Sequence, residues 1–129
     1  MKVLKIEPNK RPEVKDILEG LESLQQEVEG YIEVVYPFED PVGLVVNEEG
    51  KINGMELNRA LRDEDGNLYD IIAGPFLVVG LTEDDFCSLT DEMLDKYSKL
   101  YEKPEIFMNL GGKIHVIPMD ESLAQDIRM

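Results

Sequence analysis

The chain has 129 residues, with 28 Asp and Glu against 13 Lys and Arg, which gives a formal net charge of −15. Affinity for phosphate backbones comes mainly from Lys and Arg, so this charge argues against direct binding to nucleic acid and against adsorption to an anionic membrane surface. It favours high solubility, basic partners, or no charged partner at all.

The length suits one domain, and a hydrophobic fraction of 43% is ordinary for a globular protein. The single cysteine, Cys87, excludes an intrachain disulfide and indicates a reducing compartment. Apolar runs such as residues 76–81 are far shorter than the roughly 20 residues that cross a bilayer. Because the N-terminus also lacks the apolar core of a signal peptide, we expect a cytoplasmic protein.

The first predicted elements are a strand and a long helix. Val3, Leu4 and Ile6, which alternate with or border the charged residues at 2, 5 and 7, predict a short strand. From residue 13 to residue 29 the apolar side chains recur at helical spacing, after Pro12, which suits a first helical turn. Gly20 weakens the interior of this helix, and Gly30 is placed as its left-handed stop. The face predicted to be buried consists of Val14, Ile17, Leu18, Leu21, Leu24 and Val28.

Two strands are predicted next, at residues 31–36 and 43–47, where β-branched and aromatic side chains dominate. Residues 47–51 predict a turn with Gly50 at a positive φ, after which Ile52 begins a returning strand. We expect residues 57–61 to form a helical turn or a loop, and residues 63–67 to form a second polar turn.

The second half of the chain predicts two more strands, at residues 70–73 and 76–80, separated by a bend at Gly74–Pro75. Thr90 followed by two acids is typical of a helix start, and Pro104 ends that helix. A last edge strand is expected at residues 114–117. Together these elements predict one α+β domain, with a small mixed or mainly antiparallel sheet of about five strands and two principal helices on one face.

Recognisable catalytic groups are few. A nucleophilic pair of Cys87 and His115 is one interpretation, but single buried residues of these types are more often structural. The acidic turn at residues 63–67 fails the calcium-loop pattern, because Leu61 and Ile72 stand where oxygen ligands are needed. No zinc spacing and no glycine-rich phosphate motif occurs. We therefore expect no catalytic residue, no metal site and no cofactor.

Asn58 and Arg59 form the most informative polar pair. In a loop between apolar strands, an amide beside a guanidinium can hydrogen-bond a planar ligand or a carboxylate, and Asn47 completes this candidate binding region. The structural alternative is that Arg59 is partly buried and holds the loop through charge-assisted hydrogen bonds to backbone or to a carboxylate.

Acidic residues form the second candidate site. Between Ala60 and Asp95 there are ten acids and one base, Arg62. A contiguous negative face can imitate DNA phosphates and bind a basic or DNA-binding protein, although such a run is more often a solvated surface. The ten acids are Asp63, Glu64, Asp65, Asp70, Glu83, Asp84, Asp85, Asp91, Glu92 and Asp95; of these we take Glu83, Asp84 and Asp85 as the candidate partner contacts.

Several blocks of this sequence resemble an uncharacterised family of small proteins from phages, plasmids and integrated elements, the domain-of-unknown-function family DUF3846. The blocks are residues 30–35, 47–51, 57–59, 70–80 and 88–92. The resemblance covers about residues 2–105 and leaves residues 106–129 as a C-terminal extension. It implies a role in mobile elements, and some longer relatives resemble fusions with antirestriction-type modules. It implies no catalytic residue.

Three function classes follow. The leading one is a non-enzymatic accessory protein of a phage or mobile element that acts by protein–protein contact, with antirestriction or DNA mimicry as its sharpest form. The alternative is a domain that binds a small molecule or a nucleotide-like ligand through the Asn58–Arg59 loop. A metal-dependent hydrolase that uses acidic residues is the least favoured.

Overall fold

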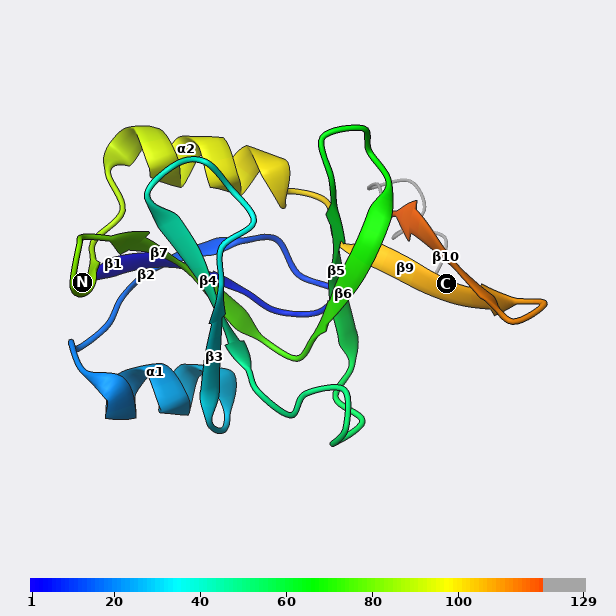
Figure 1. The fold of residues 1–129 in the computed structure, drawn as a ribbon, viewed down its shortest axis with the longest axis horizontal. Coiled ribbons are helices and arrows are strands. Elements are labelled where there is room, and N and C mark those ends of the chain that lie inside the picture. Colours follow the sequence, from blue (N-terminus) through cyan, green and yellow to red (C-terminus); the bar gives the residue numbers. More distant parts are fainter. Residues whose placement is uncertain (120–129) are drawn as a thin grey trace.

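An antiparallel sheet with a helix on each face carries two β-hairpins at one end (Figure 1). The computed structural model describes residues 1–119. The elements are β1 (Lys2–Ile6), β2 (Glu13–Asp16), α1 (Leu21–Val28), β3 (Ile32–Val35), β4 (Val42–Asn47), β5 (Leu57–Arg62), β6 (Leu68–Ala73), β7 (Phe76–Leu81), β8 (Phe86–Cys87), α2 (Asp91–Leu100), β9 (Glu105–Leu110) and β10 (Lys113–Pro118).

The main sheet has the strand order β2-β1-β7-β4-β3, and the short β8 also pairs with β7. All of these pairings are antiparallel. The apolar run of β7 is central because Val78 lies opposite Leu4 of β1 and opposite Leu44 of β4. The predicted α+β fold, with a mainly antiparallel sheet of about five strands and two helices, is confirmed.

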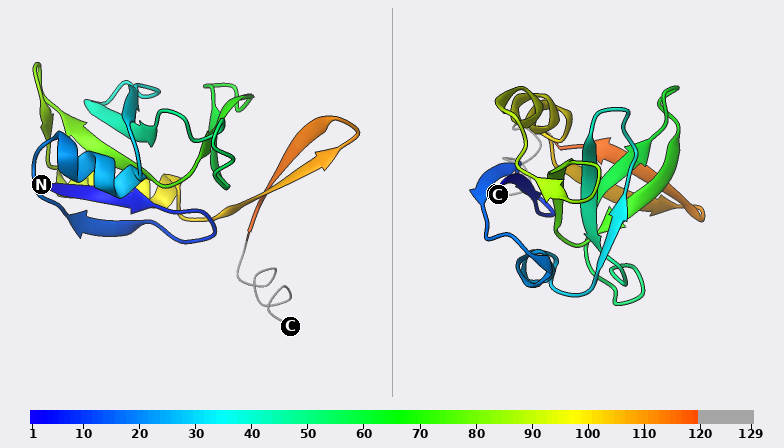
Figure 2. Two further views of the ribbon diagram at one scale, coloured as in Figure 1. Left: turned by 90° about the horizontal axis from the view of Figure 1, so that it is seen from below. Right: turned by 60° about the vertical axis from the view of Figure 1, so that its left-hand side comes forward.

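The two helices cover opposite faces of this sheet (Figures 1 and 2). Because successive side chains of a strand point to opposite faces, β7 supplies both cores. Phe76 and Val78 pack in the core that includes Leu94 and Tyr97 of α2. Leu77 and Val79 of the same strand pack in the core that includes Leu24 and Val28 of α1. The expectation that both helices lie on one face is therefore wrong.

The prediction of one long helix over residues 13–29 is also wrong. Residues 13–16 form an edge strand on β1, with Val14 opposite Leu4, and α1 begins only at Leu21. Gly20 has a φ of 112°, which a helix interior cannot contain. Of the predicted buried face, Ile17, Leu24 and Val28 are buried, whereas Val14, Leu18 and Leu21 are exposed.

Glu29, and not Gly30, adopts the left-handed conformation that ends α1. A Cβ atom at Gly30 would lie 2.7 Å from Nδ2 of Asn47. Gly30 is therefore required for the close approach of this amide rather than for a positive φ.

Residues 57–61, expected as a helical turn or loop, belong to the strand β5, which pairs with β6 around the predicted polar turn at residues 63–67. Ile52 does not begin a strand, because it lies in a turn with 84% of its surface exposed. Gly50 is not among the residues with positive φ; a Cβ there would lie 2.5 Å from the carbonyl oxygen of Ala73. The predicted bend is present at Gly74, which has a φ of 84° and leads the chain from β6 into β7.

The second helix begins as predicted, since Thr90 Oγ accepts a hydrogen bond from the backbone of Met93 at 3.2 Å. The predicted last strand lies within β10, but its partner β9 was not predicted. The turn between them is Gly111–Gly112, both at positive φ, as a type I′ two-residue turn requires. This hairpin extends away from the rest of the molecule (Figure 2).

Candidate functional site

Arg59 is buried in β5 with 1% of its surface exposed, and oxygen atoms surround its guanidinium group. Nε and Nη2 donate to the carbonyl oxygen of Tyr101 at 3.3 and 3.0 Å, and Nη2 also donates to that of Lys10 at 2.7 Å. Nη1 donates to the side-chain and backbone oxygens of Asn58 at 3.0 and 3.3 Å. The guanidinium therefore joins three chain segments that are distant in sequence.

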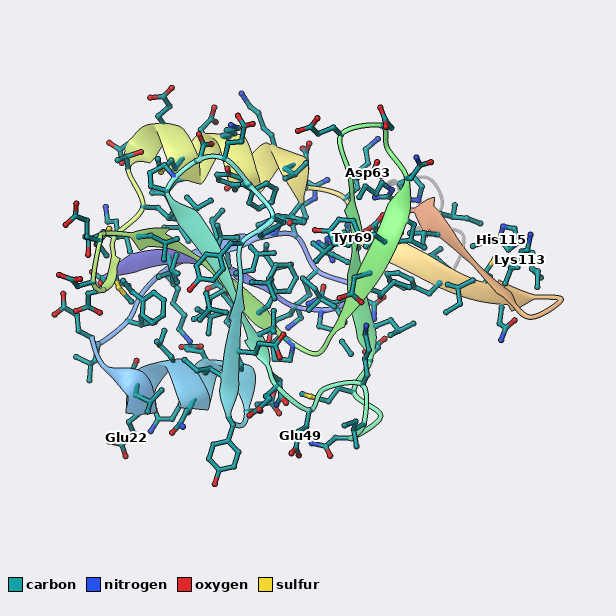
Figure 3. The ribbon with its side chains drawn as sticks, viewed as in Figure 1. Glu22, Glu49, Asp63, Tyr69, Lys113 and His115 are labelled. Carbon is teal, nitrogen blue, oxygen red and sulfur yellow. The ribbon has the colours of Figure 1, made fainter. Side chains whose placement is uncertain are left out.

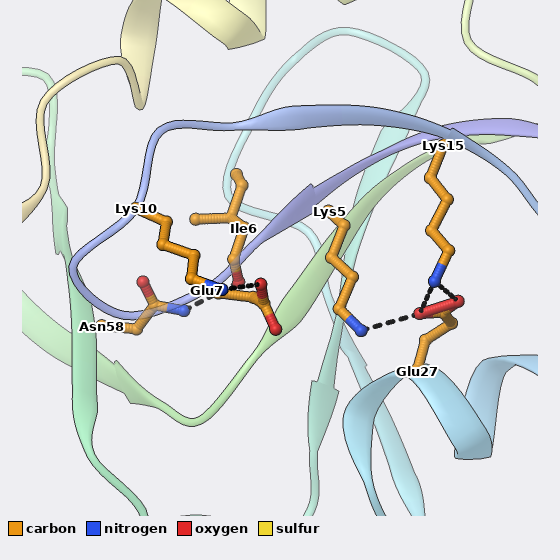
Figure 4. Close-up of polar contacts among 7 residues, drawn as sticks. All are labelled: Lys5, Ile6, Glu7, Lys10, Lys15, Glu27 and Asn58. Carbon is orange, nitrogen blue, oxygen red and sulfur yellow. Dashed lines mark hydrogen bonds and ion pairs between the residues drawn. The ribbon is translucent and has the colours of Figure 1, made fainter.

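Asn58 completes this network. Its Nδ2 donates to the carbonyl oxygens of Ile6 and Gly74, at 2.9 and 2.8 Å, while its Oδ1 accepts from Arg59 (the contact with Ile6 is drawn in Figure 4). Both amide atoms are thus used within the fold. Burial lowers the pKa of Arg59, an effect that the nearby charge of Glu105 opposes. The backbone hydrogen bonds expected of Arg59 are present, and it is more deeply buried than expected.

A hollow of about 380 Å³ borders Arg59, between the end of α2 and β5. Arg62, Lys99 and Lys103 are part of its lining. Two of these cations already have anionic partners, since Arg62 pairs with Glu105 at 3.0 Å and Lys99 with Asp95 at 3.0 Å. A ligand carboxylate in this hollow would compete with those carboxylates for the cations.

Asn47 lies apart from this network, at the end of β4. Its Nδ2 donates to the carbonyl oxygen of Val28 at 2.9 Å, and its Oδ1 accepts from the backbone of Glu49. It also borders a separate groove of about 250 Å³ between β3, β4 and β6, where Lys51 pairs with Asp70. The structure therefore brings Asn58 and Arg59 together, and leaves Asn47 with a different set of partners.

Glu83, Asp84 and Asp85 form the turn between β7 and β8. Thr82 closes this turn: its Oγ1 accepts from the backbone N–H of Asp85 at 3.0 Å and donates to the carbonyl oxygen of Asp85 at 3.1 Å. Oδ1 of Asp85 accepts from the backbone of Phe86 at 2.7 Å. All three acidic residues of the turn are exposed.

A hollow of about 240 Å³ lies between this turn and the start of α1. We call it the acidic hollow; its lining is Met1, Glu19, Gly20, Leu21, Leu24, Asp85 and Phe86. Apolar residues of α1 and β8 therefore line this hollow together with two acidic residues, Glu19 and Asp85, and with Met1, whose N-terminal ammonium group pairs with Asp16 at 2.9 Å. Glu19, Leu21 and Phe86 were not predicted as parts of a site. The sequence pattern placed Leu21 on the buried face of a helix that began at residue 13, whereas α1 begins at Leu21.

Glu27 anchors the helix that forms one side of the acidic hollow (Figure 4). Lys5 of β1 donates to its carboxylate at 2.8 Å, and Lys15 of β2 approaches it at 2.6 Å. Burial opposes ionisation of Glu27, but the hydrogen bonds from Lys15 and Lys5 outweigh it, so that the pKa of Glu27 lies below its ordinary value.

The ten acids between Ala60 and Asp95 lie in separate places. The turn that contains residues 63–65 stands at the β5–β6 end of the molecule, where Figure 3 labels Asp63, whereas the β7–β8 turn lies at the opposite end (Figure 1). Lys51 and Lys99 neutralise two others, Asp70 and Asp95. The acids form local groups, and the group in the β7–β8 turn borders the acidic hollow through Asp85.

Cys87 and His115 lie far apart, in β8 and on the projecting β9–β10 hairpin (Figures 1 and 3). Within residues 1–119, no three His, Cys, Asp or Glu side chains are grouped to hold a metal ion. Neither helix of this described part is long and apolar enough to cross a membrane.

Comparison with known proteins identifies one family. A family model described as Domain of unknown function (DUF3846) matches residues 1–102, from β1 to just past the end of α2. The acidic hollow and the Asn58–Arg59 network both lie within this range, whereas β9 and β10 lie outside it. No curated protein and no solved structure matches the chain.

Proposed function

The chain belongs to the DUF3846 family of domains of unknown function, and we propose that it acts as a non-enzymatic accessory protein that binds a basic protein through the acidic hollow. The observation that carries this proposal is the composition of the hollow: apolar residues and two acidic residues, Glu19 and Asp85, line it together, next to a turn with two further acids.

Such a hollow suits the side chain of arginine or lysine. These residues have an apolar stem and a charged end, and they commonly bury the stem while the charge stays at the surface. Leu21, Leu24 and Phe86 provide apolar contacts for a stem. Glu19 and Asp85 provide carboxylates for the charged end, and a carboxylate can accept two parallel hydrogen bonds from arginine.

The charge of the whole chain supports the same class of partner. A net charge of −15 attracts basic proteins over distances beyond direct contact and speeds their association. Proteins that hold DNA present clustered Lys and Arg, so a basic DNA-binding protein is the partner we propose. By occupying such a partner, this chain would act as an accessory factor of a phage or mobile element, in line with antirestriction or DNA mimicry.

Two variants with the same change in charge test this proposal. One replaces Glu83, Asp84 and Asp85 with Gln, Asn and Asn; the other replaces Asp63, Glu64 and Asp65 with Asn, Gln and Asn. Binding of an arginine-rich peptide is measured by calorimetry across a salt series. We expect the first variant to lose about tenfold in affinity, roughly 1.4 kcal/mol, and the second to lose much less. Equal losses would show attraction by net charge alone and would contradict a defined site.

The alternative is ligand binding beside Asn58 and Arg59, and the 380 Å³ hollow next to Arg59 is the observation in its favour. A ligand that binds the folded state raises the melting temperature. Small carboxylates and nucleotides should then raise the melting temperature of the parent protein, but not of an Arg62→Met variant, in which a cation of that hollow is removed while Arg59 remains.

A further inference from the structure

The β9–β10 hairpin, which we call the arm, is a two-stranded sheet whose exposed side chains are largely apolar. Met108, Leu110, Ile114 and Ile117 each expose at least 40% of their surface to solvent. The base of the arm is fixed to the body, where Oε1 of Glu105 accepts from the backbone of Ala60 at 2.8 Å. An isolated two-stranded hairpin is marginally stable in water, and more strands or a covering partner are needed.

The outer edge of β10 is a second open feature of the arm. Among residues 1–119, β10 pairs with β9 and with no other strand. Every second residue of an edge strand directs its backbone N–H and C=O groups away from the sheet. Such an edge, when it is apolar and carries few charges, is a template for pairing with another chain.

The distribution of charge indicates that the chain which pairs with the edge of β10 is a second copy of this protein. Residues 106–119 contain no Asp or Glu, the longest acid-free run of the sequence, and Lys113 is their only formally charged residue. Two copies with a net charge of −15 repel each other when their acidic surfaces meet. Contact through the arms avoids this repulsion, because Lys113 and His115 lie near the end of the arm, away from the body (Figure 3).

We propose that the arm joins two copies of this chain, with β10 of one copy paired antiparallel to β10 of the second across a two-fold axis near His115. The result is a four-stranded sheet with the two acidic bodies at its outer ends. Two-fold dimers in which both copies use the same surface are the commonest oligomers of soluble proteins. This dimer is independent of the acidic hollow, which stays accessible on each copy.

Sedimentation of the full-length protein over a concentration series tests the proposal. We expect the parent protein to form a dimer, and Ile114→Asp to raise the dimer dissociation constant at least tenfold. The matched control is Ile52→Asp, which places the same charge on an exposed isoleucine of the loop between β4 and β5. Added salt should strengthen the dimer by screening the acidic bodies, whereas it should weaken binding of a basic peptide at the acidic hollow.

Disulfide cross-linking tests the pairing without relying on a disruptive variant. A His115→Cys substitution in a Cys87→Ser background should give a covalent dimer under mild oxidation, because facing residues of paired strands bring their Cα atoms within disulfide distance. Ile52→Cys in the same background should stay monomeric. A parent protein that remains monomeric at every concentration, or equal cross-linking of the two variants, would overturn the proposal.

Discussion

Arg59 donates two hydrogen bonds to the carbonyl oxygen of Tyr101, from Nε at 3.3 Å and from Nη2 at 3.0 Å. Tyr101 is the C-terminal capping residue of α2, directly after Leu100, and its carbonyl oxygen faces Arg59 of β5. The last carbonyl groups of a helix have no partner within the helix. A side chain from the β5–β6 hairpin therefore completes the end of α2, which fixes this hairpin to the helix and, through the helix, to the main sheet.

We predict that Arg59→Met destabilises the protein by about 3 kcal/mol, because it leaves two buried acceptors, the carbonyl oxygen of Tyr101 and Oδ1 of Asn58, without this donor. Methionine retains most of the apolar volume, so the loss reflects the hydrogen bonds. Urea unfolding measures the difference in free energy. The control is Arg62→Met, which removes the more exposed partner of an ion pair and should cost less than about 1 kcal/mol, because Glu105 keeps its hydrogen bond from the backbone of Ala60. Similar losses in both variants would contradict the structural role of Arg59.

We predict that the stabilising effect of Glu27 depends on pH. Its pKa is lower in the folded protein, so its contribution is present above the pKa of the unfolded chain and is lost as the pH falls through the folded pKa. Glu27→Gln should therefore reduce the free energy of unfolding by about 1–2 kcal/mol at pH 7, and by less in the acidic range. Unfolding of the parent and the variant measured from neutral to acidic pH checks this; a constant difference would contradict it.

Leu21 and Leu24 should respond very differently to the same substitution. Leu21 exposes 57% of its surface, whereas Leu24 is buried against the sheet. Leu24→Asp places an unpaired charge in the core and should cost about 3–5 kcal/mol or prevent folding. Leu21→Asp should change the free energy of unfolding by less than about 1 kcal/mol. Thermal and urea unfolding compare the two variants. Equally large losses of unfolding free energy would contradict the exposed position of Leu21 and would support the long helix that the sequence pattern predicts.

The parts of the fold that were predicted from sequence are those with a strong local signal. The β-branched runs of β3, β4 and β7 and the capped start of α2 can be read from neighbouring residues, and the structure confirms them. The bend at Gly74 follows from a glycine–proline pair in the same way.

The parts that were missed depend on long-range pairing. Residues 13–16 have apolar spacing that fits a helix, but they lie at the open edge of β1 and extend the sheet there. β5 contains the buried polar pair Asn58 and Arg59, so its sequence does not alternate between apolar and polar residues. The placement of α1 and α2 on opposite faces follows from both faces of β7 being apolar. From sequence alone, a short run of apolar residues such as β7 cannot be assigned to a strand buried on both faces rather than to a helix in the core.

The candidate site was predicted in part. Asn58 and Arg59 are neighbours in one network, and Asp85 borders the acidic hollow, but the apolar side of that hollow comes from α1 and β8, which are distant in sequence. Their contact depends on the fold of the whole chain, and no local pattern contains it.

The central claim, that a basic partner binds at the acidic hollow, is tested most directly by a heteronuclear NMR titration with an arginine-rich peptide. We predict that the backbone signals of Glu19, Leu21, Asp85 and Phe86 shift first and furthest. The turn of Asp63, Glu64 and Asp65, which has as many acids but lies at the opposite end of the molecule, should shift little. Shifts of similar size at both turns, or none at the hollow, would contradict the claim.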